Sequence, residues 1–216
     1  THMTKPLKWD DTRKYDLGKV YDAEDLEKIE RYGRYLDVDG DGICYRTIPG
    51  THPTKGSFFT RGTSRDEYAK YTERGEVYVR IVNRILKKWE TAKSHVPAPQ
   101  LFQDDYKSNK GILFFGTTTY AALEAMELFE KEGIELDAMR IKAVPFNETV
   151  EDFIEKHDEI FVIEQNRDAQ FRSIIINELD TNPDKLIKIL NYDGMPITAK
   201  TIMDLIMEKL SVAINN

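Results

Sequence analysis

Three aspartates at alternate positions are the first residues of this chain whose spacing suggests chemistry. Asp37, Asp39 and Asp41 are followed by Gly42, which fits the opening of a calcium-binding loop, D-x-D-x-D-G. In such loops alternate carboxylates converge on one hard cation, and the glycine permits a sharp turn. The twelfth position, where a bidentate acidic side chain is needed, holds Ile48. The pattern therefore favours an Asp/Gly turn held by side-chain hydrogen bonds over a metal site.

A run of small polar residues, Gly116, Thr117, Thr118 and Thr119, lies between a predicted strand and a predicted helix. Free backbone amides and the positive end of the helix dipole can hold a phosphate or a carboxylate at such a junction. Loops of this kind also begin the crossover helices of most α/β domains, so a simple N-cap role for Thr117 is the alternative that we favour.

Four consecutive polar residues, Glu164, Gln165, Asn166 and Arg167, follow directly after an apolar run. Open parallel sheets keep their functional groups at the carboxyl ends of the strands. These four residues therefore predict contact with a neighbouring domain or subunit. The start of a solvated helix is the open alternative.

The histidines and the single cysteine offer little for catalysis. His95 and His157 have no Ser, Cys or carboxylate set around them that would suggest a nucleophile. His157 is predicted to end a helix, where its positive form suits the helix dipole. Cys44 stands alone, which excludes an intrachain disulfide framework and leaves no thiolate set for an iron–sulfur cluster or a zinc site.

Two helical stretches are predicted in the first part of the chain. The first runs from Asp22 to Tyr35, with Asp22 as its cap. The second runs from Asp66 to Ser94, where apolar residues recur at intervals of about four, and Gly75 divides it. The segment His95 to Pro99 stops this helix, because its two prolines donate no amide hydrogen and push the preceding residues toward extended geometry.

We therefore expect a connector arm over residues 4–99 and a separate domain over residues 100–216. From Gly111 onward, short apolar runs alternate with helical ones, which implies right-handed crossovers and a mainly parallel sheet covered on both faces. The predicted fold is α/β with three layers, preceded by a helical and irregular arm. The expected strands are Ile112 to Phe115, Met139 to Val144, Ile160 to Glu164 and Leu186 to Leu190. One helix is expected to follow Gly116–Thr119 and to end at Lys131. The other expected helices run from Thr149 to Lys156, from Arg167 to Leu179 and from Thr198 to about Val212.

The composition is that of a soluble protein. With 216 residues, of which 40% are hydrophobic and 32% charged, the chain can bury one core of ordinary domain size and carry an appendage. A net charge of -7 and a pI near 5.3 disfavour partners such as nucleic acid or an anionic membrane. The hydrophobic runs are too short to span a bilayer. We expect a cytoplasmic protein.

Three blocks of sequence carry a resemblance to a known enzyme family. They are the glycine- and aromatic-rich segment Asp37 to Tyr71, IEQNRDAQF at Ile163 to Phe171, and YDGMPITA at Tyr192 to Ala199. Together they resemble the C-terminal part of the alpha subunit of 2-oxoacid:ferredoxin oxidoreductases, the 2-oxoglutarate type in particular, over about Gly18 to Leu210. The resemblance implies a transketolase C-terminal-like fold for residues 100–216.

By this resemblance the chain is a piece of an enzyme and is inactive when isolated. The family uses thiamine diphosphate, magnesium and an iron–sulfur cluster to decarboxylate a 2-oxoacid oxidatively, with coenzyme A accepting the acyl group and ferredoxin the electrons. None of these cofactors is expected in this fragment. The implied partners are the remainder of the alpha subunit, the beta subunit, ferredoxin through the complex, and coenzyme A, in an oligomer. The resemblance implies that a domain contacting thiamine would precede Thr4 and is missing here. Thr1 to Met3 reads as a tag remnant ahead of an internal start point, with a natural N-terminus as the alternative.

Gly40-Asp41-Gly42 also imitates the start of the thiamine diphosphate motif, in which an Asp binds the magnesium ion. That motif needs a partner Asn further along, and positions 66 to 72, where it would fall, hold no Asn. In the family the motif belongs to the separate beta subunit, so its absence here agrees with the resemblance.

The connector carries charged residues that could reach the 2-oxoacid carboxylate or the cofactor from the rest of the enzyme. Arg and Lys would supply charge-assisted hydrogen bonds. The alternative is a connector wrapped along the missing domain and a subunit interface, and no single residue is assigned a catalytic role. The candidates are His52, Lys55, Arg61, Arg65 and Glu67.

Two other functions stay open. A stand-alone module for a phosphate-bearing ligand such as coenzyme A would use the Gly116 loop. A pure assembly domain predicts no ligand but an exposed apolar surface made by the arm before Pro97. Because the 2-oxoglutarate assignment rests only on which subfamily the motifs resemble, pyruvate and branched-chain 2-oxoacids also remain open as substrates.

Overall fold

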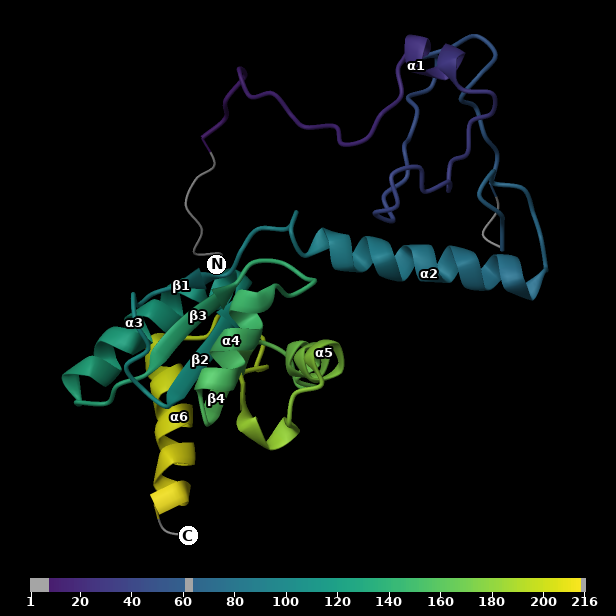
Figure 1. Ribbon diagram of the computed structural model, residues 1–216. Helices are drawn as coiled ribbons and strands as arrows, with labels where there is room; N and C mark the ends of the chain where they lie inside the picture. The colour runs from purple at the N-terminus through teal and green to yellow at the C-terminus, as the bar shows by residue number, and fades with distance from the viewer. Residues whose placement is uncertain (1–7, 61–63, 215–216) are drawn as a thin grey trace. The chain divides into compact units, whose positions relative to one another are not determined.

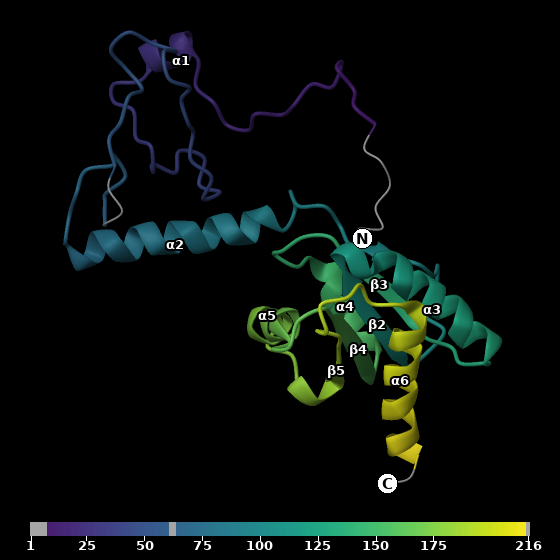
Figure 2. The same cartoon turned by 180° about the vertical axis from the view of Figure 1, so that it is seen from behind.

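The computed structural model describes residues 8–60 and 64–214 and divides the chain into two compact units. We call Lys8–His95 the arm unit and the part from Val96 onward the α/β unit. Figure 1 labels their helices and strands except β5, which is labelled in Figure 2. Each unit is described by itself below.

The α/β unit is built on a five-stranded sheet in the order β1-β3-β2-β4-β5. The four longer strands run parallel, and the short β1 pairs antiparallel with β3 at one edge. β5 forms the other edge and places the exposed Lys188 at its centre. The strands are β1 (Gln100–Leu101), β2 (Lys110–Phe115), β3 (Asp137–Ile141), β4 (Glu159–Glu164) and β5 (Leu186–Leu190).

The central strands are apolar on both faces because each face is covered by helices. Successive side chains of a strand point to opposite faces. Accordingly, Ile112 and Phe114 belong to one core cluster, with helices α3 and α6, whereas Leu113 between them belongs to another, with α4 and α5. Figures 1 and 2 show the two helix layers from opposite sides. The predicted three-layer α/β fold is thus confirmed. The helices are α3 (Thr119–Lys131), α4 (Glu148–Lys156), α5 (Gln170–Leu179) and α6 (Ala199–Ile214), with short 3₁₀ turns at Gly116–Thr118 and Pro183–Lys185.

The strand order creates a switch point between β2 and β4. The chain leaves β2 toward β3 on one side, and then returns past β2 to build β4 and β5 on the other. Open α/β sheets bind ligands outside the carboxyl ends of the strands at such a point. The loops that follow β2 and β4 are therefore the first place to look for a functional site.

A buried contact between His157 and Asp137 links several elements at the amino edge of the sheet. His157 is the C-cap of α4, as predicted, and its Nε2 lies 3.0 Å from Oδ2 of Asp137, while its Nδ1 lies 2.6 Å from the Phe153 carbonyl oxygen. Asp137 also accepts hydrogen bonds from the backbone amides of Lys107 and Ser108. The pair links β3, α4 and the segment before β2, a contact that sequence spacing gave no means of predicting.

The arm unit has less regular structure than the sequence predicted. Its helices are α1 (Ala23–Lys28) and α2 (Gly75–Ala92), so both predicted helices were too long. Asp22 does cap α1, through a reciprocal capping box with Asp25, but the chain turns extended at Ile29.

The predicted start of the second helix was wrong for a local reason. The Asp66 side chain accepts hydrogen bonds from the amides of Tyr68 and Lys70, which makes a turn instead of a helix. Ala69 in this turn has a φ of 64°, in the left-handed region. The helix therefore begins only at Gly75. No helix in the described part of the chain is both long and apolar enough to cross a membrane.

Candidate functional site at the carboxyl edge of the sheet

Two segments that the sequence singled out separately meet at the switch point. Gln165, directly after β4, donates a hydrogen bond from Nε2 to Oγ1 of Thr118 at 3.0 Å and lies 3.2 Å from Oγ1 of Thr117, directly after β2. The predicted Gly116–Thr119 and Glu164–Arg167 groups thus form one edge. We call Gly116–Thr119 together with Glu164–Arg167 the carboxyl edge.

The N-cap role that the sequence favoured for Thr117 is wrong. A 3₁₀ turn at Gly116–Thr118 precedes α3, so the N-cap position belongs to Thr118, whose side chain makes no capping hydrogen bond. Gly116 has a φ of 57°, which a glycine adopts without strain. The hydroxyl groups of Thr117 and Thr118 face Gln165 instead.

Glu164 is buried and holds the rest of the edge in place. Its carboxylate accepts hydrogen bonds from the amides of Phe171 at 2.8 Å and Arg172 at 2.9 Å, in the first turn of α5, and from Nδ2 of Asn166 at 2.7 Å. A carboxylate at a helix N-terminus is stabilised by the helix dipole, and several N–H donors offset the cost of burying it. Glu164 therefore supports the loop from inside and does not reach a ligand.

Asn166 completes the same loop. Its Oδ1 accepts from the amides of Asp168 and Gln170, at 3.1 and 3.3 Å. Ala169 adopts a left-handed φ of 50° just before α5. The loop is thus held in one conformation by its own hydrogen bonds, which the sequence block alone did not indicate.

The exposed groups of the edge are the hydroxyl of Thr117, the amide of Gln165 and the guanidinium of Arg167. Arg167 is paired at 2.8 Å with its neighbour Asp168. Hydroxyl, amide and guanidinium groups recognise carboxylates, phosphates and backbone groups of another protein. Their chemistry suits binding and not bond making.

The connector candidates His52 and Lys55 lie in the arm unit, where they hold the end of α1. Lys55 donates from Nζ to the carbonyl oxygens of Leu26 and Glu27, at 3.1 and 3.3 Å, and to Oε2 of Glu27 at 3.0 Å. Nδ1 of His52 accepts from the amides of Thr54 and Lys55. Its Nε2 therefore carries the proton and donates to Oε1 of Glu27 at 2.6 Å. These bonds lower the pKa of the Glu27 carboxyl, the bond from His52 most of all.

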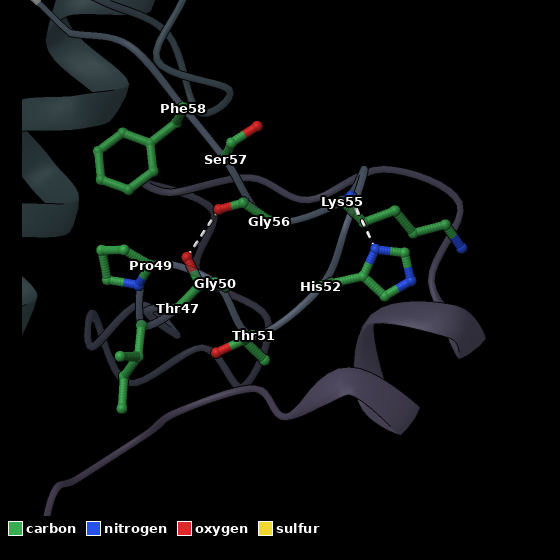
Figure 3. Close-up of a pocket in the computed structure, with 10 residues that line it drawn as sticks. Thr47, Pro49, Gly50, Thr51, His52, Lys55, Gly56, Ser57 and Phe58 are labelled. Atoms are coloured by element: carbon green, nitrogen blue, oxygen red, sulfur yellow. Dashed lines mark hydrogen bonds between the residues drawn. The ribbon is translucent and has the colours of Figure 1, made fainter.

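Figure 3 shows His52 and Lys55 in the wall of a small cavity. The loop Thr47–Phe58 closes around a volume of about 290 Å³, and Oγ1 of Thr47 donates to the carbonyl oxygen of Gly56 across it. Because both side chains are bonded to residues of α1, they support the loop. The sequence offered no means of telling this support from a ligand contact.

Arg65 and Glu67 also lie in the arm unit, and Arg61 falls outside the described residues. Arg65 donates to the hydroxyl of Tyr35 at 3.3 Å, and Glu67 pairs with Arg80 of α2 at 3.1 Å. The described connector candidates thus divide between the end of α1 and the side of α2.

The three alternating aspartates form a turn and not a cation cage. Both carboxylate oxygens of Asp37 accept backbone amides, those of Gly40 and Gly42, at 2.9 Å each. The ammonium group of Lys19 lies 2.6 Å from a carboxylate oxygen of both Asp39 and Asp41. This contact with Lys19 lowers the pKa of Asp41. Within the described residues, no group of three His, Cys, Asp or Glu side chains is arranged to hold a metal ion.

The turn Asp37–Gly42 packs directly against helix α2. A Cβ added to Gly42, whose φ is 81°, would lie 2.3 Å from the backbone nitrogen of Lys88. Arg84 donates to the Gly42 carbonyl oxygen at 2.8 Å, and Thr91 donates to the Asp41 carbonyl oxygen at 2.6 Å. The D-x-D-x-D-G pattern is therefore a helix-docking turn, and Gly42 is required by close backbone contact.

The chain has detectable similarity to proteins of known function. No known family profile matches the chain. A curated relative, subunit alpha of 2-oxoacid:ferredoxin oxidoreductase 2 from Aeropyrum pernix, is 25% identical over 170 residues. The match covers 77% of this chain and 25% of that protein.

Two solved structures match parts of this chain to different degrees. The 2-oxoglutarate:ferredoxin oxidoreductase from Magnetococcus marinus, with 2-oxoglutarate, coenzyme A and succinyl-CoA bound, matches with a TM-score of 0.72 and 22% identity over 88% of this chain and 32% of that chain. A split-gene transketolase, described as an inactive beta4 tetramer, matches with a TM-score of 0.41 and 16% identity over 59% of this chain and 55% of its own. The chain thus spans about a quarter of the curated relative and about a third of the Magnetococcus chain.

Proposed function

The chain is a relative of the alpha subunits of 2-oxoacid:ferredoxin oxidoreductases, as its motifs predicted, and from this premise we propose that it works as the C-terminal part of such a subunit. The observation that carries the proposal is the 25% identity over 170 residues to a curated alpha subunit. The whole enzyme would decarboxylate a 2-oxoacid oxidatively, form an acyl-CoA and reduce ferredoxin.

We assign 2-oxoglutarate as the substrate of this enzyme. The Magnetococcus enzyme of similar fold binds 2-oxoglutarate, coenzyme A and succinyl-CoA, which supports the assignment. The sequence blocks around Asp37–Tyr71 and Ile163–Phe171 resemble the same subfamily. Among the described connector candidates, His52 and Lys55 would not read the second carboxylate of the substrate, because both are bonded to Glu27.

The cofactors of such an enzyme do not fit the residues of this chain. The Asp39 and Asp41 carboxylates both bind the ammonium group of Lys19, so the turn that imitates a thiamine diphosphate motif already holds a cation of the chain itself and does not suit magnesium. A single cysteine cannot hold an iron–sulfur cluster. Thiamine diphosphate, magnesium and the cluster therefore belong to the rest of the alpha chain, the beta subunit or another partner.

The chain's own contribution is architectural. The carboxyl edge presents Gln165 and Arg167 on a loop that the buried Glu164 holds rigid. Such a preset polar surface suits a contact with a neighbouring domain or subunit. The chain would thus help to position the thiamine-binding domains, in a cytoplasmic complex of several subunits.

Reconstitution tests the proposal. The purified chain is mixed with the matching beta subunit and the remaining part of the alpha chain, and 2-oxoglutarate- and coenzyme A-dependent reduction of a viologen dye is measured. We expect activity only when all three parts are present. Full activity without this chain, together with no complex that contains it, would refute the proposal.

Coenzyme A titration addresses the alternative of a stand-alone ligand module at the Gly116 loop. The described site gives this alternative little support, because the hydroxyl groups of Thr117 and Thr118 already face Gln165. We expect no heat of binding when coenzyme A is titrated into the isolated protein. Binding that is lost in Thr117→Val would favour the alternative.

A further inference from the structure

The arm unit lacks a core of its own. Among its described residues, the apolar side chains that are buried are Leu26, Ala69 and Val77. The α/β unit, in contrast, contains two clusters of a dozen or more buried residues each. A unit the size of the arm needs a substantial apolar core, a metal or a partner to stay folded. The arm therefore has to bury more apolar surface against something else.

Helix α2 carries that surface. One face of the helix packs on the Asp37–Gly42 turn through Arg84, Lys88 and Thr91. The other face is apolar and exposed: Tyr78 is 58% exposed, Val79 54%, Ile85 49% and Leu86 59%. Positions seven apart lie nearly above one another on a helix, so these side chains and the half-buried Val82 form one stripe. We call Tyr78, Val79, Val82, Ile85 and Leu86 the α2 stripe.

A groove runs beside the α2 stripe within the arm unit. It has a volume of about 280 Å³, and its walls include Tyr35, Arg65, Tyr78, Arg84 and Ile85. The Nε atom of Arg84 is buried and makes no hydrogen bond within the described residues. The groove thus combines apolar walls with two guanidinium groups, a combination that suits an acidic side chain flanked by apolar ones.

The charge of α2 agrees with an acidic partner surface. The helix has four basic residues and two acidic ones, in a chain whose net charge is -7. Opposite charge around an apolar contact favours the right partner and fixes its register. In a symmetric dimer of this chain the basic helix would face its own copy, so a second copy is a poorer complement than an acidic surface.

We propose that the α2 stripe and its groove are the docking surface for the remainder of the longer alpha chain, which would present an apolar face with at least one acidic side chain. This inference rests on the proposed function. The relatives of the chain are three to four times longer than the part that it matches. The 18-residue helix extends over ~27 Å, which is long enough to lie along a folded domain.

A charge placed in the stripe tests the proposal. Leu86→Asp and Ile85→Asp replace exposed apolar side chains, and Asn83→Asp on the polar side of the same helix is the matched control. Each variant of the whole chain is titrated with the remaining alpha-chain polypeptide and the beta subunit, and the dissociation constant is measured. We expect the two stripe variants to bind about 30-fold or more weakly than wild type, and Asn83→Asp to bind within a factor of about three. Circular dichroism should show all three variants as folded as wild type.

Other outcomes would overturn the inference. Wild-type affinity in both stripe variants would refute the docking surface while leaving the proposed function intact. A dimer of the isolated protein that Leu86→Asp dissociates would show that a second copy is the occupant. Slow amide hydrogen exchange and protected stripe side chains in the isolated monomer would show that the chain covers the stripe itself. Failure of wild type to bind the other parts, in an enzyme that is active without it, would refute the proposed function as well.

Discussion

At the scale of single residues, the buried Glu164 explains how an exposed loop can stay rigid. Its carboxylate is bonded to two helix amides and to Asn166, so the loop that carries Gln165 and Arg167 is tied to both β4 and α5. Glu164, which the sequence suggested as a contact with a neighbouring domain or subunit, thus supports the residues beside it.

We expect Glu164→Gln to destabilise the protein by about 2–3 kcal/mol. The amide has the shape of the carboxylate, but its NH₂ group would face an N–H donor at Phe171 or Arg172. Urea unfolding measures the loss. Asp168→Asn, an exposed acid in the same loop, is the control and should change stability little; equal losses in both variants would contradict the argument.

Substitutions at two glycines of the same turn distinguish the cost of backbone strain from the cost of a steric clash. Gly40 and Gly42 both have positive φ, 75° and 81°, but a Cβ on Gly40 has its nearest neighbour at 3.9 Å whereas one on Gly42 would meet the Lys88 nitrogen at 2.3 Å. We expect Gly40→Ala to cost about 1 kcal/mol and Gly42→Ala about 3 kcal/mol or more. Faster amide hydrogen exchange in α2, specific to Gly42→Ala, would identify the lost docking. Equal effects would mean that only the backbone conformation matters.

At the scale of elements, the end of α1 depends on the bonds of Glu27 to His52 and Lys55. His52 and Lys55 hold the pKa of Glu27 below its ordinary value of 4.5. Because the folded-state pKa is the lower one, the contribution to stability is complete above pH 4.5 and is lost as the pH falls through the depressed value.

The melting temperatures of wild type and Glu27→Gln should therefore differ at pH 6 and converge toward pH 3. Thermal denaturation followed by circular dichroism across this range measures the difference. Glu24→Gln, on the same helix, serves as the control. A difference between wild type and Glu27→Gln that does not vary with pH would rule out the carboxylate as the cause.

The elements that the sequence predicted best are strands formed by short apolar runs. β2 and β4 are short apolar runs because both of their faces are buried. Their predicted limits, like those of β5, agree with the structure to within two residues. The helices of the arm were predicted too long, since the side chain of Asp66 and the left-handed Ala69 break a regular apolar pattern. β1 has two residues and no periodicity to detect.

The two polar groups of the candidate site could be predicted from the sequence, but the contact between them could not. Both polar groups were placed correctly at strand ends, yet the contact of Gln165 with Thr117 and Thr118 depends on β2 and β4 being neighbours. Strand order follows from packing across the whole sheet, which no local pattern reveals. The roles of His52, Lys55 and Gly42 likewise arise from partners 25 to 46 positions away, and spacing rules do not detect such distant partners.

At the scale of the whole molecule, the two units differ in what keeps them folded. The α/β unit has a core on each face of its sheet, whereas the arm unit buries few apolar side chains among its described residues. We expect residues 96–216 to unfold cooperatively when expressed alone, and residues 8–95 to give a poorly dispersed NMR spectrum. A cooperative thermal transition of residues 8–95 alone would contradict this.

The edges of the sheet determine how the isolated protein would aggregate in the absence of its partners. β1 offers only two residues for pairing, and β5 places the exposed Lys188 in the middle of its edge. Short and charged edges are poor templates for adding strands from other molecules. Aggregates of the isolated chain should accordingly form through the apolar helix of the arm, remain free of cross-β structure, and dissolve when that helix is given a negative charge.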